Sequence, residues 1–202
     1  MQSSMGTRGS GRLLVLGVGL AVILGILGGT AAATGLRDPL SPLTTSKGSI
    51  LCFRRDYSAA HLAQHPQQMT KSVLLAFEQG FVTVVLRQRT GAEKRILATC
   101  DWRQGAGIDT SDHKMVPNFN GSAGFDCMVT VDDSAEEAGY GLIDPAQDGQ
   151  SLMLFLQSPI YVEGDQSSHG KGYRLALRTE DRTFALTRTD TKICQPYKPV
   201  AE

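Results

Sequence analysis

Two histidines, His61 and His65, stand four residues apart in the stretch YSAAHLAQHP. If that stretch is helical, the two side chains share one face, and histidines at this spacing can ligate zinc. The residues between them are Leu-Ala-Gln, so no glutamate is present to act as a base, and no third ligand stands close by. Three interpretations follow: a structural turn, a metal-dependent or hydrolytic site, and a contact with a partner.

The same stretch carries the signals of one short helical turn. Ser58 can cap its start, because the hydroxyl can accept a hydrogen bond from an early backbone N–H. Pro66 ends it, since the residue before a proline avoids the α-helical region. We expect Leu62 to be buried beneath the turn and one histidine to bond to the backbone. The structural interpretation is therefore the preferred one.

The N-terminus has the pattern of a signal peptide. Arg8 and Arg12 precede an apolar run over 13–27, and Ala31 and Ala33 supply the small residues that signal peptidase needs. We expect a signal peptide over 1–33 with cleavage after Ala33, which places the protein in the periplasm or outside the cell. The alternative is an uncleaved anchor in the inner membrane, because residues 13–33 are long enough to span a bilayer.

Four cysteines, Cys52, Cys100, Cys127 and Cys194, follow that segment. No two of them form a C-x-x-C pair, which argues against zinc, and an even number in an exported chain is typical of disulfides. Three pairings are possible. We favour Cys100 with Cys127, because both lie on the apolar faces of consecutive predicted strands, which leaves Cys52 with Cys194. A nucleophilic pair of Cys52 and His61 would require a reduced cysteine.

A second candidate site lies between two of these cysteines, in the expected loop over 101–124. Loops of this length are uncommon and often functional. This one holds the only tryptophan of the chain, Trp102, together with Arg103 and His113. Tryptophan and arginine are typical anchors of interfaces, so these three residues are candidate contacts to a ligand or partner. The alternative is that Trp102 folds back onto the end of the domain.

The body of the chain alternates between apolar and polar residues, which predicts antiparallel strands. We expect an all-β fold, an antiparallel meander that forms a small barrel or sandwich, with one short helical turn near the N-terminus. The expected organisation is a flexible linker over 34–48, a single β-domain over 49–196 and a C-terminal tail over 197–202. Apolar faces are expected from Val73, Leu75 and Phe77, from Val82, Val84 and Leu86, and from Phe125, Cys127, Val129 and Val131.

One set of residues resembles the opening of a group of small exported bacterial proteins of unknown function. The set comprises Cys52, Tyr57-Ser58, Ala60-His61-Leu62, His65-Pro66 and Gln68, with the later cysteines and the segment Asp181-Arg182-Thr183-Phe184-Ala185-Leu186. The stretch VTVDDSAEEAG after Cys127 departs from the acidic, glycine-rich turn that the group would have there. The resemblance implies export and a β-domain, and it assigns no catalytic residue.

Charge narrows the choice of partners. Residues 1–33 hold two of the 20 basic residues and none of the 20 acidic ones, so the mature chain carries a net charge of about −2. That balance argues against nucleic acid as a partner, and a membrane contact is expected only if the N-terminal segment stays uncleaved. No cofactor motif is present. We expect a non-enzymatic module that binds an envelope protein or a small ligand; the alternatives are an envelope enzyme using His61 and His65 and an anchored structural protein.

Overall fold

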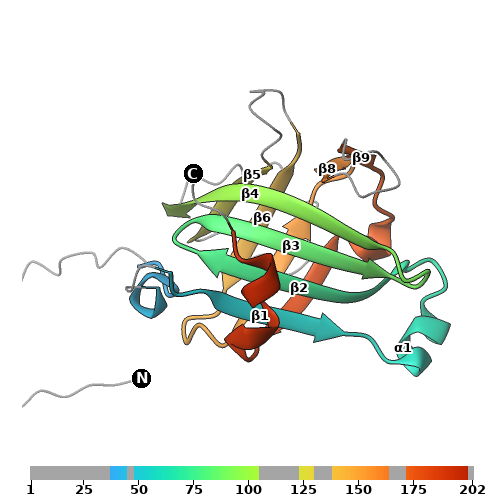
Figure 1. The fold of residues 1–202 in the computed structure, drawn as a ribbon, viewed down its shortest axis with the longest axis horizontal. Coiled ribbons are helices and arrows are strands. Elements are labelled where there is room, and N and C mark those ends of the chain that lie inside the picture. Colours follow the sequence, from blue (N-terminus) through green and yellow to red (C-terminus); the bar gives the residue numbers. More distant parts are fainter. Residues whose placement is uncertain (1–36, 45–47, 105–122, 130–137, 164–171, 200–202) are drawn as a thin grey trace, which may run out of the picture. The chain divides into compact units, whose positions relative to one another are not determined.

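The computed structural model describes residues 37–44, 48–104, 123–129, 138–163 and 172–199, which belong to the compact unit over 34–202. Eight antiparallel strands close into a barrel in the order β1-β10-β7-β6-β5-β4-β3-β2, and two short strands form a separate ribbon (Figure 1). The fold is thus all-β, as predicted, and a barrel rather than a sandwich. The strands are β1 (Leu51–Asp56), β2 (Thr70–Glu78), β3 (Phe81–Gln88), β4 (Glu93–Gln104), β5 (Ala123–Val129), β6 (Tyr140–Pro145), β7 (Ser151–Leu156), β8 (Ile160–Val162), β9 (Tyr173–Leu175) and β10 (Thr183–Arg188).

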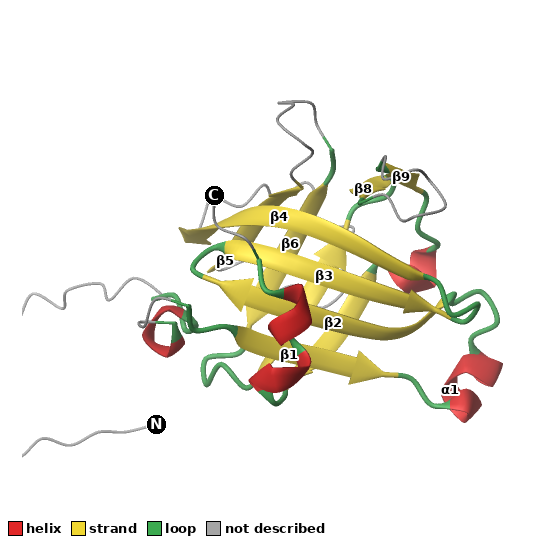
Figure 2. Ribbon diagram, viewed as in Figure 1, coloured by secondary structure: helices red, strands yellow, loops and turns green. Residues whose placement is uncertain are grey.

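Helical structure in the described residues is short (Figure 2). The predicted turn is the helix α1 (Ala59–Gln64), and Ser58 caps it by accepting a hydrogen bond from the His61 N–H. Single 3₁₀ turns are η1 (Ser41–Leu43), η4 (Thr179–Asp181), η5 (Thr191–Ile193) and η6 (Gln195–Tyr197). The predicted signal peptide over 1–33 lies outside the described residues.

The barrel interior is filled by side chains. Period-two alternation turns one face of each strand inward, and the inward face carries large apolar residues such as Phe53, Phe77 and Phe184, which are almost fully buried. The inward-facing residues expected in β2, β3 and β5 belong to this core, Val131 excepted, since it lies outside the described residues. Barrels of eight strands are either filled by side chains or hold one small ligand, and the large buried residues of this barrel correspond to the filled kind.

The outer face of β1, β2 and β3 is also buried, because the C-terminal segment lies across it. Ile193 and Tyr197 pack on a second apolar cluster of outward-facing residues, among them Leu74, Ala76 and Val85. Coverage of both faces explains why the sequence of β2 and β3 is apolar almost continuously. The tail expected over 197–202 therefore begins with a residue that contributes to packing.

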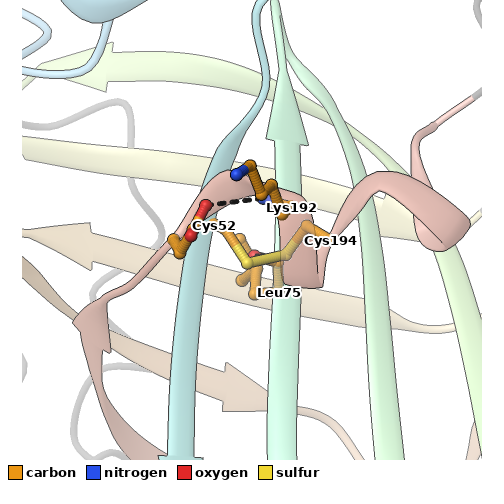
Figure 3. The surroundings of a disulfide bond; sticks show 5 residues. Cys52, Leu75, Lys192 and Cys194 are labelled. Carbon is orange, nitrogen blue, oxygen red and sulfur yellow. Dashed lines mark hydrogen bonds between the residues drawn. A yellow bond between two sulfur atoms is a disulfide. The ribbon is translucent and has the colours of Figure 1, made fainter.

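Both predicted disulfides are present. Cys52 on β1 is bonded to Cys194 on the outer face, where the Cys194 sulfur lies 3.5 Å from the Leu75 carbonyl oxygen (Figure 3). Cys100 is bonded to Cys127 on the inner face, and the two residues are direct partners in the β4–β5 ladder. The argument from neighbouring strands is confirmed.

Two segments differ from the sequence-based expectation. The residues Asp38–Thr44 fall in the expected flexible linker, yet they form η1 and place Leu40, which is fully buried, in the core at one end of the barrel. The expected loop over 101–124 is shorter, because β4 continues to Gln104 and β5 begins at Ala123. Residues 105–122 lie outside the described part of the chain.

Candidate functional site

The predicted site residues lie at opposite ends of the barrel (Figure 1). His61 lies in α1, and His65 is the residue that follows its last turn. Just before α1, the Tyr57 N–H donates to the Lys71 carbonyl in β2. Trp102 and Arg103 lie near the end of β4, beside the turn that joins β2 to β3. His113 is outside the described residues. The four predicted contact residues that the structure describes therefore do not form one site.

At the end of the barrel where α1 lies, three aromatic side chains stack on one another. The ring centroids of Tyr57 and His61 are 4.7 Å apart, those of His61 and His65 are 4.3 Å apart, and both pairs are close to parallel. The guanidinium of Arg55 lies 5.3 Å from the Tyr57 ring centroid. Burial raises the pKa of the Tyr57 hydroxyl, although the nearby Arg55 charge opposes the shift; the Asp181 charge adds a smaller raising effect. The stack contacts the core through Tyr57.

Hydrogen bonds hold His61 in this position. Its Nε2–H donates to the side-chain oxygen of Gln68 at 3.0 Å, and the Gln68 amide in turn donates to the Thr70 carbonyl at 2.7 Å. Gln68 is buried, so its side-chain amide fixes the ring orientation of His61. The sequence led us to expect a bond from a histidine ring to the backbone and a buried Leu62; the bond goes to a side chain instead, and Leu62 is half-buried.

The end of α1 is closed by charged side chains. Arg89 donates to the carbonyl oxygens of Leu62 and His65 at 2.7 and 2.5 Å. The His65 ring lies 3.6 Å from the Glu180 carboxylate. Asp181, which is 2% exposed, accepts hydrogen bonds from the backbone N–H groups of Met69 and Thr70. These contacts tie α1 to β2 and η4.

This geometry does not favour metal chelation by the two histidines. In parallel stacked rings the nitrogen lone pairs do not converge on one point, and the Nε2 of His61 is already engaged with Gln68. Among the described residues no cluster of three or more histidine, cysteine or acidic side chains is arranged to hold a metal ion. The contacts of His61 and His65 support a structural turn.

The opposite end of the barrel has an open hollow of about 470 Å³. One wall comes from η1 and from residues on either side of it, a second from the β2–β3 turn and the end of β2, and a third from β4 and β5. The lining residues are Asp38, Ser41, Thr44, Phe77, Gln79, Gly80, Cys100, Asp101, Trp102 and Phe125. We refer to this set as the η1 hollow.

The backbone of the β2–β3 turn allows the hollow to form. Gln79 and Gly80 both have positive φ, at 48° and 89°. A Cβ at Gly80 would lie 2.9 Å from the Cys100 carbonyl oxygen, so glycine is needed for this close approach. The side chain of Gln79 reaches the Thr44 carbonyl at 3.5 Å, which links the turn to η1.

Trp102 is half-buried and forms part of the aromatic wall. Its ring meets Phe125 edge to face, with centroids 5.1 Å apart, and Phe125 meets Phe77 in the same way at 5.0 Å. Trp102 thus folds back on the barrel end, as the alternative interpretation expected, and still lines the hollow. It also lines a second hollow, of about 330 Å³, which extends along β6, β7 and β10.

Two acidic residues, Asp38 and Asp101, line the η1 hollow, and Asp126 lies next to Asp101 on β5 without lining it. Burial raises the pKa of Asp38 above its ordinary value even though the Leu40 N–H donates to its carboxylate at 2.8 Å. Asp101 and Asp126 are direct cross-strand partners, and burial, together with Asp101, raises the pKa of Asp126 although Arg103 and Tyr140 oppose the shift. Arg103 lies 3.7 Å from Asp101.

Sequence reasoning missed most of the η1 hollow. It singled out Trp102 and Arg103 but not Asp38, Phe77 or Phe125. Asp38 is followed by Pro39 in a segment rich in turn-forming residues, which predicts a linker, and the two phenylalanines have the alternation of ordinary core residues. Only the folded arrangement brings these three residues together.

No family model, curated protein or solved structure matches the chain. Within the part of the chain that the structure describes, none of the helices has the length and apolar character needed to cross a bilayer.

Proposed function

We propose that the protein is an exported, disulfide-bonded β-barrel that binds a partner in the envelope at the η1 hollow. Two disulfides fit a periplasmic or extracellular location, because such bonds persist in oxidising compartments. The signal peptide predicted over 1–33 would direct the chain to that location. The group of small exported bacterial proteins that the sequence resembles also implies export and a β-domain.

The observation that carries this proposal is the composition of the η1 hollow. It combines an aromatic wall with polar groups from three separate segments, and concave sites of this size and mixed lining are typical of binding sites. The interior of the barrel is filled by large buried side chains, which favours a site at the end of the barrel. The lining residues lie on η1, on the β2–β3 turn and on strands of the barrel, so the barrel fixes the shape of the hollow.

The enzymatic alternative has weaker support. It rests on His61 and His65, whose contacts are accounted for by the stack with Tyr57 and the bond to Gln68. The anchored alternative rests on the N-terminal segment, and sequencing the N-terminus of the mature protein tests it. A first residue of Thr34 would support export with cleavage, and an intact N-terminus would favour the anchor.

A cross-linking pull-down from the cell envelope tests the binding proposal. The purified wild-type protein is compared with Trp102→Phe, which changes the η1 hollow, and with His65→Ala, which changes the other end of the barrel. We expect one set of partners to be captured by the wild type and His65→Ala and to be reduced for Trp102→Phe. Capture that depends on His65 and is independent of Trp102 would contradict the proposed site.

A further inference from the structure

The helix α1 is attached to the barrel by a small number of contacts. None of its residues is buried. It is held by hydrogen bonds from Arg89 to carbonyls at its end, by the bond between His61 and Gln68, and by the ring stack on Tyr57. A segment with few buried apolar contacts opens locally more easily than the sheet beside it. A change in the ring stack should therefore alter how firmly α1 is held.

The two histidines of the stack can change charge. An imidazole is the side chain that ordinarily gains or loses a proton between about pH 5 and about pH 8. The centroids of the His61 and His65 rings are 4.3 Å apart, and the His65 side chain is 42% exposed to solvent. The stack can therefore take up protons from solvent, and a charge on one ring acts directly on the other.

The surroundings favour a first proton on His65. Its Nδ1 lies 3.6 Å from Oε1 of Glu180, and this contact becomes an ion pair when the ring is protonated. Glu180 belongs to η4, which is held against β2 because its last residue, Asp181, accepts hydrogen bonds from the N–H groups of Met69 and Thr70. A proton on His65 therefore ties the end of α1 to η4 and, through η4, to the barrel.

The surroundings do not favour a second proton, on His61. Two positive charges at the separation of these rings repel each other, and solvent at the surface screens that repulsion only in part. Arg55 lies over the Tyr57 ring, and Arg89 lies at the carbonyl end of α1. Both add positive charge close to His61 and His65.

The acidic groups that face the stack offset this repulsion only in part. After the first proton, Glu180 is paired with His65, and both oxygens of Asp181 already accept backbone hydrogen bonds. The other charged side chains of the neighbouring segments are Arg54 and Asp56, which pair with each other, Arg178, which bonds to Gln67, Arg182, which lies over Phe155, and the exposed Lys71.

From these observations we propose that the ring stack is a pH-sensitive switch for α1. One proton, held on His65 by Glu180, strengthens the attachment of α1 to the barrel, and a second proton, on His61, weakens it. The attachment is firmest at an intermediate pH, at which the stack carries one positive charge. This inference goes beyond the proposed binding function and does not depend on it, because the stack lies at the opposite end of the barrel from the η1 hollow (Figure 1).

Hydrogen exchange measured by mass spectrometry tests this switch. The purified protein, with both disulfides intact, is sampled from about pH 8 to about pH 5, and each rate is corrected for the intrinsic pH dependence of amide exchange. The readout is the segment 59–68, in which the N–H groups of Leu62, His65 and Gln68 donate hydrogen bonds. We expect its protection to rise about two- to fivefold with the first proton, the worth of an exposed ion pair, and to fall again at lower pH. Protection of β3 should show no such maximum.

Two variants separate the rise from the fall. Glu180→Gln removes the partner of the first proton, so the rise should be lost. His61→Phe keeps a ring in the stack and cannot take up the second proton, so the rise should remain and the fall should be lost. Asp148→Asn removes a carboxylate from the exposed β6–β7 turn, at the end of the barrel where η1 lies, and should leave the profile unchanged. Thermal unfolding shows whether each variant is folded, and the partly exposed Glu180 position decides the rise even if His61→Phe does not fold.

Three results would overturn this inference. Protection of 59–68 that stays constant, or that changes in one direction only, would show that the two protons do not act in opposite ways. A maximum that persists in Glu180→Gln would exclude the ion pair as its cause. A parallel change in β3 would show that the whole barrel responds to pH, rather than α1 alone.

Discussion

Cys52 and Cys194 are 142 residues apart in the chain and are bonded to each other on the outside of the barrel, with Cα atoms 5.7 Å apart. The bond fixes the C-terminal segment against β1 and β2. Tyr197 then reaches the outer face of β3 and β4, where its hydroxyl donates to Glu93 and accepts from Arg87. The first strand and the last residues of the domain are thereby held together.

The two disulfides should contribute unequally to stability. Replacing both Cys52 and Cys194 by alanine should cost about 4 kcal/mol, and replacing Cys100 and Cys127 about 3 kcal/mol, because the first pair closes the longer loop. Guanidinium unfolding of the oxidised proteins measures both losses. A larger loss from the Cys100–Cys127 pair would show that native packing, rather than loop length, governs the difference.

Substitution of Asp181 should destabilise the fold more than substitution of most other polar residues. Asp181→Ala leaves the buried N–H groups of Met69 and Thr70 without an acceptor, so we expect a loss of about 2–4 kcal/mol in the free energy of unfolding. Asp148→Ala is the control, since Asp148 accepts one bond, from the Gln150 N–H, in an exposed turn. Urea unfolding should show a loss of less than about 1 kcal/mol in the free energy of unfolding for that control. Equal losses in the two variants would contradict the role given to the Asp181 hydrogen bonds.

Asp126 should make stability depend on pH. Its pKa is raised in the folded state by burial, so its stabilising contribution is present in full below the ordinary value of 3.8 and is lost as the pH rises through the folded-state pKa. Asp126→Asn should therefore stabilise the protein at pH 7, and the gain in the free energy of unfolding should be below about 1 kcal/mol. A higher melting temperature at pH 7 would show this gain. The difference should vanish at pH 3, and a destabilised variant at pH 7 would refute this account.

His61 and His65 should affect stability rather than metal content. His61→Ala removes two ring contacts and the bond to the buried Gln68, which should cost about 1–2 kcal/mol. His65→Ala, at the more exposed end of the stack, should cost less than about 1 kcal/mol. Thermal unfolding is paired with zinc analysis of the purified proteins. Stoichiometric zinc that disappears in either variant would revive the enzymatic hypothesis.

The sequence predicts the barrel wall well, because each inward residue obeys a local rule. Alternation places Val82, Val84 and Leu86 on one face, and the same rule puts Cys100 and Cys127 on the inner faces of strands that turn out to be neighbours. The cap at Ser58 and the stop at Pro66 are also local signals, and α1 follows them.

The η1 hollow could not be predicted in the same way. Leu40 lies among prolines and turn-forming residues, yet it is buried in the main core and lies close to Gly149 in the β6–β7 turn, more than a hundred residues later in the chain. Trp102 continues the inward alternation of Ile96, Ala98 and Cys100, and that pattern does not distinguish a residue that lines a hollow from an ordinary core residue. A site built from such residues depends on tertiary contacts that no short window of sequence records.

Closure of the barrel between β1 and β10 also has a consequence for export. The first strand pairs with a strand that is synthesised near the end of the chain, so the barrel cannot close before β10 is available. Folds dominated by such distant pairings form slowly. In the export that we propose, the chain would therefore stay unfolded during translocation, and the bond of Cys194, the last cysteine in the sequence, would form only after the whole barrel has crossed the membrane.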